Sequence, residues 1–578
     1  MTPRASRRLA IAVLTAVLIA AAPPLVRADV APPGDTRDRL TFDELMTGAP
    51  NRDGPVHNDY FMPIGHADPA HHAFEGVLGF IGAPFFVGQG RFPSFQVSFV
   101  TTDGYLVPVE HDIVQPLSGG WDLILSPGRV WSEPGDNGWS RASFPFVLTG
   151  RTWNDSHNGL ATFLYNDTDV SDATFQIVQE AASWSRFDAW SQLQLLYQPG
   201  PVDGKADLVA TFNDMLAQRI PTAPLDTLSA DSHLIDGMER GLGHITVTGL
   251  LDDGVLYRTP CYTRYGDYPY CDDMRHGVYA VTMSAGAALS LLWLAERYGP
   301  EVFDAKIADN VDVTADHDGW NNVTFRDAID MATGIGEMAP NQTSAIDDIY
   351  ADGERFIYRF ANALGVETKL DVAFEDGRYE WGPGEVVRYN DLHTFTLAVA
   401  MDAYLKDREG PDAHLWEMVS EEVLRPIGVA VAPMMHTREA DRSRGIPIMG
   451  WGFFPTLDDL AKIAQLYQDR GAHNGRQLLY ADEIDVLLDG SGSDLTIPWR
   501  TAYGTYRYDF SFWYMPYRGQ ASCGVAIPEM IGIGGNIVTL MPNGMTGIRL
   551  ADADDDSDAM WSGENMAALA DNVRSFCE

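Results

Sequence analysis

The chain is poor in lysine, in cysteine and, after its first 28 residues, in long apolar runs. Of its 578 residues, five are lysine and four are cysteine. No later apolar run is long enough to cross a bilayer, so we expect no membrane span. Positive charge is also scarce, because 40 Lys and Arg stand against 81 Asp and Glu, for a net charge of −41. Since such a field repels polyanions, we expect no nucleic-acid partner.

The first 28 residues have the pattern of a secretory signal. Three arginines in the first eight residues form a positive start, and residues 9–22 form an apolar core too short for a membrane helix. Val26-Arg27-Ala28 offers a small-x-small cleavage site. The segment holds four arginines and no acid, so its removal would leave a net charge of −45. We therefore expect an exported protein, either periplasmic or fully secreted.

The four cysteines suggest two disulfides, because an even number of cysteines is typical of exported proteins. Cys261 and Cys271 would close a short loop, and Cys523 and Cys577 would tie a late strand to the C-terminus. Three pairings exist, and the sequence does not choose among them. No C-x-x-C or Cys/His spacing indicates zinc. We expect no metal and no cofactor.

Changes in amino-acid composition along the chain predict two domains. Residues 29–58 form a lead-in rich in Pro, Asp and Gly. Residues 59–220 have short runs of aromatic, aliphatic and polar residues between Gly, Asn, Asp and Pro, which predicts a β-rich domain, a sandwich or a barrel. Residues 216–230 have the composition of a linker. The second domain is expected to span residues 225–578.

A helix over Tyr279–Tyr298 is the element around which the second domain is expected to form. Its residues are apolar on nearly every side, and Gly299-Pro300 ends the run. A short helix is expected from Thr324 to Gly334. Longer helices are expected at 345–364, 391–407, 412–425, 456–470 and 565–576. With strands before and after the helices, this order predicts an α+β fold, an antiparallel sheet flanked by helices.

Three strings in the second domain carry a family resemblance. VTFRDAIDMATGIG at 323–336 is similar to a T-(I/F)-R-D-L-L-x-x-T-S-G segment, and GPGEVVRYND at 382–391 is similar to P-G-x-x-x-x-Y-x-N. IGIGGN at 531–536 is similar to a late strand with Lys-Thr-Gly or His-x-Gly. In this order the strings resemble the β-lactamase and penicillin-binding-protein-like serine hydrolases, which include DD-peptidases, class C β-lactamases and esterases. The resemblance covers about 225–578 and implies their β-lactamase/transpeptidase-like fold.

The resemblance also implies where the catalytic positions lie. The family pattern Y-S-V-T-K-S falls on YAVTMS at 279–284, so Ala280 stands at the nucleophile position and Met283 at the position of the basic lysine. Tyr389 matches the proton-transferring tyrosine, and Asp391 stands where Asn is usual. Ile533 stands at the position of the basic residue that binds a substrate carboxylate.

The frame of the site is therefore kept while its Ser/Lys dyad is substituted. The strand glycines Gly534 and Gly535 stand where the resemblance implies backbone donors for an oxyanion. No S-x-x-K occurs in the chain, since the residues three before the five lysines are Val, Phe, Val, Ala and Asp. Ser284, one turn after Ala280, is the nearby hydroxyl, but Ala287 stands where its base would be.

Three hypotheses remain. The first is a non-catalytic binder of a small-molecule, peptide or cell-wall-like ligand. The second is an active hydrolase of esters, amides or β-lactams that uses Ser284 or Tyr389. The third is carbohydrate or surface binding through the N-terminal β domain. Weak metal candidates, at 552–558, 316–319 and the histidines at 57, 66, 71 and 72, are explained as well by acidic turns and loops.

Overall fold

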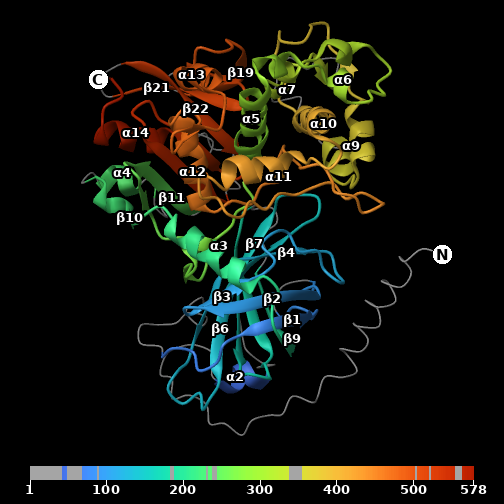
Figure 1. Ribbon diagram of the computed structural model, residues 1–578. Coiled ribbons are helices and arrows are strands. Elements are labelled where there is room, and N and C mark those ends of the chain that lie inside the picture. Colours follow the sequence, from blue (N-terminus) through green and yellow to red (C-terminus); the bar gives the residue numbers. More distant parts are fainter. Residues whose placement is uncertain are drawn as a thin grey trace, which may run out of the picture.

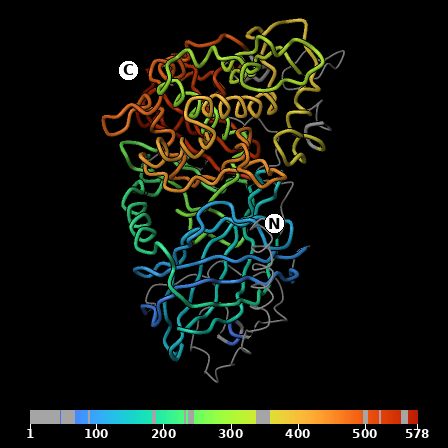
Figure 2. Tube along the Cα trace, turned by 45° about the vertical axis from the view of Figure 1, so that its right-hand side comes forward, coloured from blue at the N-terminus to red at the C-terminus, as the bar shows by residue number. Residues whose placement is uncertain are grey.

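The computed structural model describes most of the chain after residue 67. The described residues are 42–47, 68–86, 90–181, 188–229, 232–236, 238, 244–336, 355–501, 504–519, 523–552 and 563–577. The expected signal at 1–28 and most of the lead-in lie outside them. Two large sheets organise the molecule, one early and one late in the chain, and they lie one above the other (Figures 1 and 2).

The first sheet has nine antiparallel strands and is closed. Strand β6 pairs with β4 and β5 along one edge and with β7 along the other, while β1 pairs with both β2 and β9. Of the two forms expected for the β-rich part, this is the barrel. Its strands are β1 (Glu75–Ile81), β2 (Phe95–Thr102), β3 (Tyr105–Pro108), β4 (Asp122–Leu125), β5 (Gly128–Trp131), β6 (Ser140–Thr149), β7 (Ser156–Tyr165), β8 (Ala173–Glu180) and β9 (Ala189–Pro199).

Alternating aromatic residues fill the interior of this sheet. Along β6, Phe144 and Phe146 belong to an inner cluster, whereas Val147 belongs to the cluster shared with the second part of the chain. The period of two places one face of each strand inside and the other outside. The outer face of β6, β7 and β8 is thus available for packing against the second sheet and its loops.

The segment that joins the two sheets is more ordered than a linker. Helix α3 (Lys205–Ala217) follows the closed sheet, and β10 (Thr222–Pro224) pairs in parallel with β12 (Val255–Arg258). The residues at 216–230, which have the composition of a linker, thus include β10 and a 3-10 turn at Leu225–Thr227. Their prolines are compatible with β10 because this strand lies at the edge of the second sheet, where a missing N–H costs little.

The second sheet has nine strands in the order β10-β12-β11-β24-β23-β22-β21-β20-β19. Apart from β10, neighbouring strands are antiparallel. The strands not yet named are β11 (Ile245–Asp252), β19 (Thr496–Thr501), β20 (Gly504–Asp509), β21 (Phe512–Arg518), β22 (Gly524–Gly532), β23 (Asn536–Leu540) and β24 (Thr546–Ala551).

Helices cover both faces of this sheet (Figure 1). On β24, Gly547 faces Met566 of α14, while Ile548 belongs to the cluster that holds the central helix and α12. The predicted α+β fold is confirmed. The helices are α2 (Phe42–Thr47), α4 (Ser232–Asp236), α5 (Leu289–Tyr298), α6 (Ile307–Asn310), α7 (Phe325–Ile329), α9 (Val366–Ala373), α10 (Asp391–Glu409), α11 (Leu415–Val419), α12 (Leu457–Gln468), α13 (Ala481–Asp489) and α14 (Glu564–Val573).

Several helices begin at or near the residue that the sequence predicted, whereas some end at a different residue. A capping box with Thr324 begins α7, and an equivalent one with Thr456 begins α12. Helix α7 ends at Ile329, so the expected end at Gly334 was wrong. The helix expected at 412–425 is α11 followed by a π-helical turn, η10 (Ser420–Leu424). Most of the helix expected at 345–364 lies outside the described residues.

Both disulfides form, and the structure selects one pairing. Cys261 is bonded to Cys271, and Cys523 is bonded to Cys577. The first closes the loop that precedes the central helix, and the second ties the start of β22 to the end of the chain. Within the described part of the chain, no helix has both the length and the apolar character needed to cross a membrane.

Tyrosine hydroxyls from the Cys261–Cys271 loop join the two sheets. Tyr268 donates to the carbonyl of Gly159 at 3.0 Å, and Tyr270 donates to the carbonyl of Ser143 at 3.1 Å. Both tyrosines are buried. Because buried hydroxyls are costly unless bonded, these contacts hold the loop, and the helix that follows it, against the outer face of β6 and β7.

Candidate functional site

The segment from Tyr279 to Tyr298 begins with a residue in the left-handed backbone region, and almost all of its residues are buried. Tyr279 has a φ of 47°, and Ala280 follows it at the start of the helical segment. The segment continues as a π-helical turn, η6 (Met283–Ala288), and then as α5, which Gly299 ends. A positive φ is rare for a tyrosine and persists only where neighbouring groups hold it.

The hairpin between β6 and β7 holds that residue in place. Asn154, with 0% of its surface exposed, accepts a hydrogen bond from the Tyr279 backbone N–H at 2.7 Å and donates to the carbonyl of Phe453 at 3.2 Å. Asp155 accepts from the Tyr279 hydroxyl at 2.6 Å. A Cβ on Gly277 would lie 1.5 Å from the Asn154 carbonyl oxygen, so the approach requires glycine. The closed sheet therefore contributes directly to the start of the central helix.

A second contact fixes the same hairpin to the loop before α12. The indole N–H of Trp451 donates to the carbonyl of Thr152 at 3.2 Å. The rings of Trp153 and Trp451 lie 5.8 Å apart. Sequence reasoning missed this role of the hairpin, because nothing local in residues 150–155 indicates a partner more than 120 positions away.

Met283 and Tyr389 meet inside the second part of the chain. The Tyr389 hydroxyl donates to the Met283 sulfur at 3.1 Å, and the exposed fractions of the two residues are 7% and 1%. Tyr389 also packs against Tyr508 and Trp513, with ring centroids 5.5 and 5.2 Å away. Ala280 is half-buried and packs against the same apolar cluster. The structure thus brings together the positions that the resemblance assigns to nucleophile, base and tyrosine.

Ser284 points away from this group. Its hydroxyl donates to the backbone carbonyl of Ser511 at 2.6 Å, and its own carbonyl accepts from the Tyr467 hydroxyl at 2.8 Å. Ser511 follows Phe510 in the tight turn between β20 and β21, where both residues have a positive φ. The Ser284 hydroxyl therefore contributes to holding a strained turn.

Asp391 is the first residue of α10. The side chain of Asn390 caps this helix by accepting the Leu392 N–H at 2.9 Å. Burial raises the pKa of Asp391 to about 7. Its carboxyl lies against Gly450, where a Cβ would come within 3.1 Å of an Asp391 oxygen. Asp391 is therefore a group that titrates near neutral pH, as groups at functional sites often do.

On the late strand, Gly532 lies closest to the start of the central helix. A Cβ on Gly532 would lie 2.1 Å from the carbonyl of Val278 and 3.2 Å from the N–H of Val281. Gly534 and Gly535 both have a positive φ in the turn after the strand, and Ile533 between them and Gly532 is partly buried. The tight backbone approach at Gly532 is a feature that the string alone did not single out.

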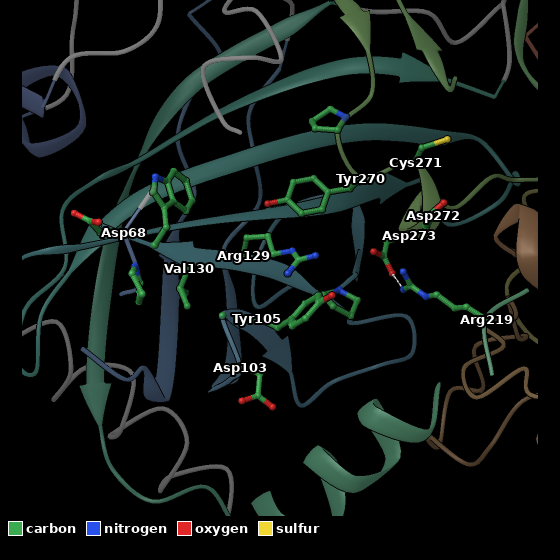
Figure 3. A pocket seen from close by; sticks show the side chains of 15 residues that line it. Asp68, Asp103, Tyr105, Arg129, Val130, Arg219, Tyr270, Cys271, Asp272 and Asp273 are labelled. Carbon is green, nitrogen blue, oxygen red and sulfur yellow. Dashed lines mark hydrogen bonds and ion pairs between the residues drawn. The ribbon is translucent and has the colours of Figure 1, made fainter. Parts of the chain in front are cut away.

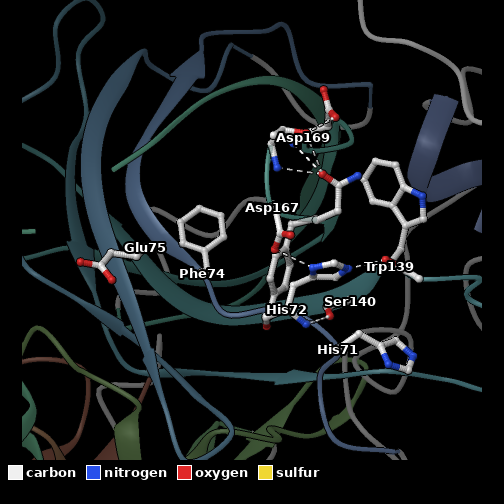
Figure 4. A network of polar contacts seen from close by, with 12 residues as sticks. His71, His72, Phe74, Glu75, Trp139, Ser140, Asp167 and Asp169 are labelled. Carbon is white, nitrogen blue, oxygen red and sulfur yellow. Dashed lines mark hydrogen bonds and ion pairs between the residues drawn. The ribbon is translucent and has the colours of Figure 1, made fainter. Parts of the chain in front are cut away.

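The weak metal candidates within the described residues do not gather into a site. Among the described residues, no group of three or more His, Cys, Asp or Glu side chains could hold a metal ion. His72 instead places one ring nitrogen 2.7 Å from Asp167 and the other 2.5 Å from the carbonyl of Gly138 (Figure 4). His317 contacts the carbonyl of Asp376 at 2.8 Å. The residues at 57, 66 and 553–558 lie outside the described part.

Comparisons with known proteins found a distant likeness to solved structures and no other match. No family model matches the chain, and no curated protein matches it. A penicillin-binding protein homolog from Caulobacter crescentus is 13% identical, with a TM-score of 0.41, over 59% of this chain and 97% of its own. A D-stereospecific amidohydrolase from Streptomyces sp. is 14% identical, with a TM-score of 0.40, over 60% and 98%.

A family VIII carboxylesterase is also similar. It is 14% identical to this chain, with a TM-score of 0.42, over 62% of this chain and 98% of its own. The similar structures are thus β-lactamase and penicillin-binding-protein-like serine hydrolases. At these identities and TM-scores, the likeness gives no information about the activity of this chain.

Proposed function

We propose that this chain is an exported, non-catalytic binding protein with the frame of a serine hydrolase. The observation that carries the proposal is the contact between the Tyr389 hydroxyl and the Met283 sulfur. At the position that the resemblance assigns to a basic amine, the side chain is an uncharged thioether. A thioether is a weak acceptor and does not take up a proton at neutral pH.

The nucleophile position supports the same conclusion. Ala280 has no attacking atom, and the neighbouring Ser284 hydroxyl is engaged by the Ser511 carbonyl at 2.6 Å. Losing nucleophile and base together removes several orders of magnitude in the rate of a hydrolase that depends on both. The aromatic and methionine side chains around Tyr389 favour an apolar or aromatic portion of a ligand over a charged one.

The proposal of export rests on the signal-like N-terminus and on the two disulfides. Structural disulfides form and persist in oxidising compartments and are rare in the cytosol of most organisms. A high negative charge keeps such a protein soluble.

The decisive test is an activity assay of the purified full-length chain. Nitrocefin, p-nitrophenyl esters and a fluorescent penicillin should give neither turnover nor a covalent adduct. Loss of an observed activity in Ser284→Ala or Tyr389→Phe would instead establish the second hypothesis, an active hydrolase.

The double variant Ala280→Ser/Met283→Lys restores the two missing groups at their positions. We expect slow acylation by the fluorescent penicillin, because the Tyr389 hydroxyl already contacts the side chain at position 283. Ala280→Ser/Met283→Leu is the matched control, since it has the hydroxyl without the amine and should remain inert.

A further inference from the structure

A cavity of about 770 Å³ lies where the closed sheet meets the Cys261–Cys271 loop (Figure 3). Strands β3 and β5 provide Tyr105 and Arg129, the loop provides Tyr270, and the turn after it provides Asp272 and Asp273. This volume is typical of sites for small molecules, which often lie between domains. The cavity is distinct from the group around Ala280 and Met283, so its role is independent of the function proposed above.

Arg129 differs from the other charged residues of this cavity because it is stacked on an aromatic ring. It is half-buried, and its guanidinium carbon lies 3.7 Å from the centre of the Tyr105 ring, its cross-strand partner. Among the residues that the structure describes, no carboxylate forms an ion pair with it. Stacking on a ring holds the flat guanidinium in one orientation and leaves its N–H groups free to bind a carboxylate in bidentate geometry.

The other charges of the cavity define what Arg129 can bind. Asp273 is paired with Arg219, and Asp272 accepts from Arg258 at 2.7 Å. Asp68 and Asp103 are exposed at the edge of the cavity. Because like charges repel, an anion with a single charge is tolerated here better than a doubly charged one.

The remaining lining is largely apolar. The Tyr270 hydroxyl is already bonded to the Ser143 carbonyl, so this residue offers its ring rather than a polar group. Trp131, on the same face of β5 as Arg129, also lines the cavity. We propose that this cavity binds a monocarboxylate with a flat apolar body, with the carboxylate on Arg129 and the body against the aromatic side chains of the cavity wall.

The test uses the full-length protein and three fluorinated probes observed by ¹⁹F NMR titration. These are 4-fluorophenylacetate, its neutral amide 4-fluorophenylacetamide, and 4-fluorophenyl phosphate. Wild type should bind the carboxylate saturably and at least tenfold more tightly than either other probe. Equal binding of the amide, or tighter binding of the phosphate, would overturn the proposal whatever the variants do.

Variants then locate the site. Arg129→Met should lose at least tenfold in affinity for 4-fluorophenylacetate. Arg129→Lys should lose less, because lysine keeps the positive charge but lacks the planar guanidinium that binds a carboxylate in bidentate geometry. Arg476→Met, at an exposed arginine of β18 (Arg476–Gln477), is the matched control and should bind as wild type does. Unchanged binding in Arg129→Met, or equal losses in both methionine variants, would contradict the assignment. If Arg129→Met does not fold, Arg129→Lys and the probe comparison decide.

Discussion

The hydroxyl of Tyr389 donates a hydrogen bond to the sulfur of Met283 across 3.1 Å. The two residues are 106 positions apart, and both are buried in one cluster of aromatic and methionine side chains. A thioether is a soft, polarizable partner for a hydroxyl and for neighbouring rings. The contact therefore satisfies a buried phenol without introducing a charge, and it makes Met283 part of the packing.

Met283→Lys should destabilise the fold at pH 7, by about 2–4 kcal/mol in the free energy of unfolding, because an ammonium group would replace a side chain that is 1% exposed. Met283→Leu conserves volume and apolar character and should cost under about 1.5 kcal/mol. Urea unfolding of both variants measures the difference. Equal stabilities would mean that the surroundings of Met283 already solvate a cation, which contradicts their apolar packing.

Ser284→Ala should cost about 1–3 kcal/mol, because it leaves the buried Ser511 carbonyl without the Ser284 hydroxyl. Ser290 on α5 offers a matched control. Its hydroxyl is equally buried and has no hydrogen-bond partner among the described residues. Ser290→Ala should therefore be neutral or slightly stabilising. Urea unfolding compares the two, and a larger loss at Ser290 would refute the role assigned to Ser284.

Asn154→Ala should destabilise the chain by about 1–3 kcal/mol, because it removes the side-chain oxygen that accepts the hydrogen bond of the buried Tyr279 N–H. Asn154→Asp retains the acceptor but buries a carboxylate against the Phe453 carbonyl, so its loss should be at least as large. Asn572→Ala, at an exposed position, is the control. Chemical denaturation gives the free energies, and near-ultraviolet circular dichroism reports on Trp153 and Trp451. An unchanged spectrum and stability in Asn154→Ala would show that the hairpin is not needed.

Glu529 should make the protein less stable as the pH rises toward neutrality. Burial raises its pKa to about 7 from the ordinary 4.5, although Thr539 and the Gly563 N–H donate to its carboxyl at 3.0 and 2.9 Å. Between these two values the folded state keeps a proton that the unfolded state releases. The free energy of unfolding therefore falls with pH across this window, by about 3 kcal/mol, and this contribution is constant above pH 7.

Glu529→Gln removes the titrating group while keeping an acceptor for the same donors. The difference in the free energy of unfolding between wild type and this variant should change from pH 5 to pH 7 and then level off. Urea titrations at pH 5, 6, 7 and 8 measure it. A difference that does not vary with pH would rule out Glu529 as the source.

Local signals in the sequence accounted for much of the second part of the chain. The apolar run from Tyr279, the cap at Thr324 and the glycine at 299 predicted a buried helix, a helix start and a helix end, and the structure has all three. These features depend on neighbours within about four residues, which is the range of helix hydrogen bonds and caps. The hypothesis that the Ser/Lys dyad is substituted likewise rests on single positions, and it stays a prediction. The domain boundaries near 220–225 and the roles of the site residues stay predictions.

Contacts between distant segments decided the rest. Which cysteines pair, that the first sheet closes, and that Asn154 holds Tyr279 all depend on residues brought together from far apart. The order of amino acids alone predicted a frame without its reactive pair. Packing across the two sheets decided that a methionine sulfur bonds the tyrosine hydroxyl there, because the partner of a buried polar group is selected by three-dimensional proximity and by the cost of leaving that group unpaired.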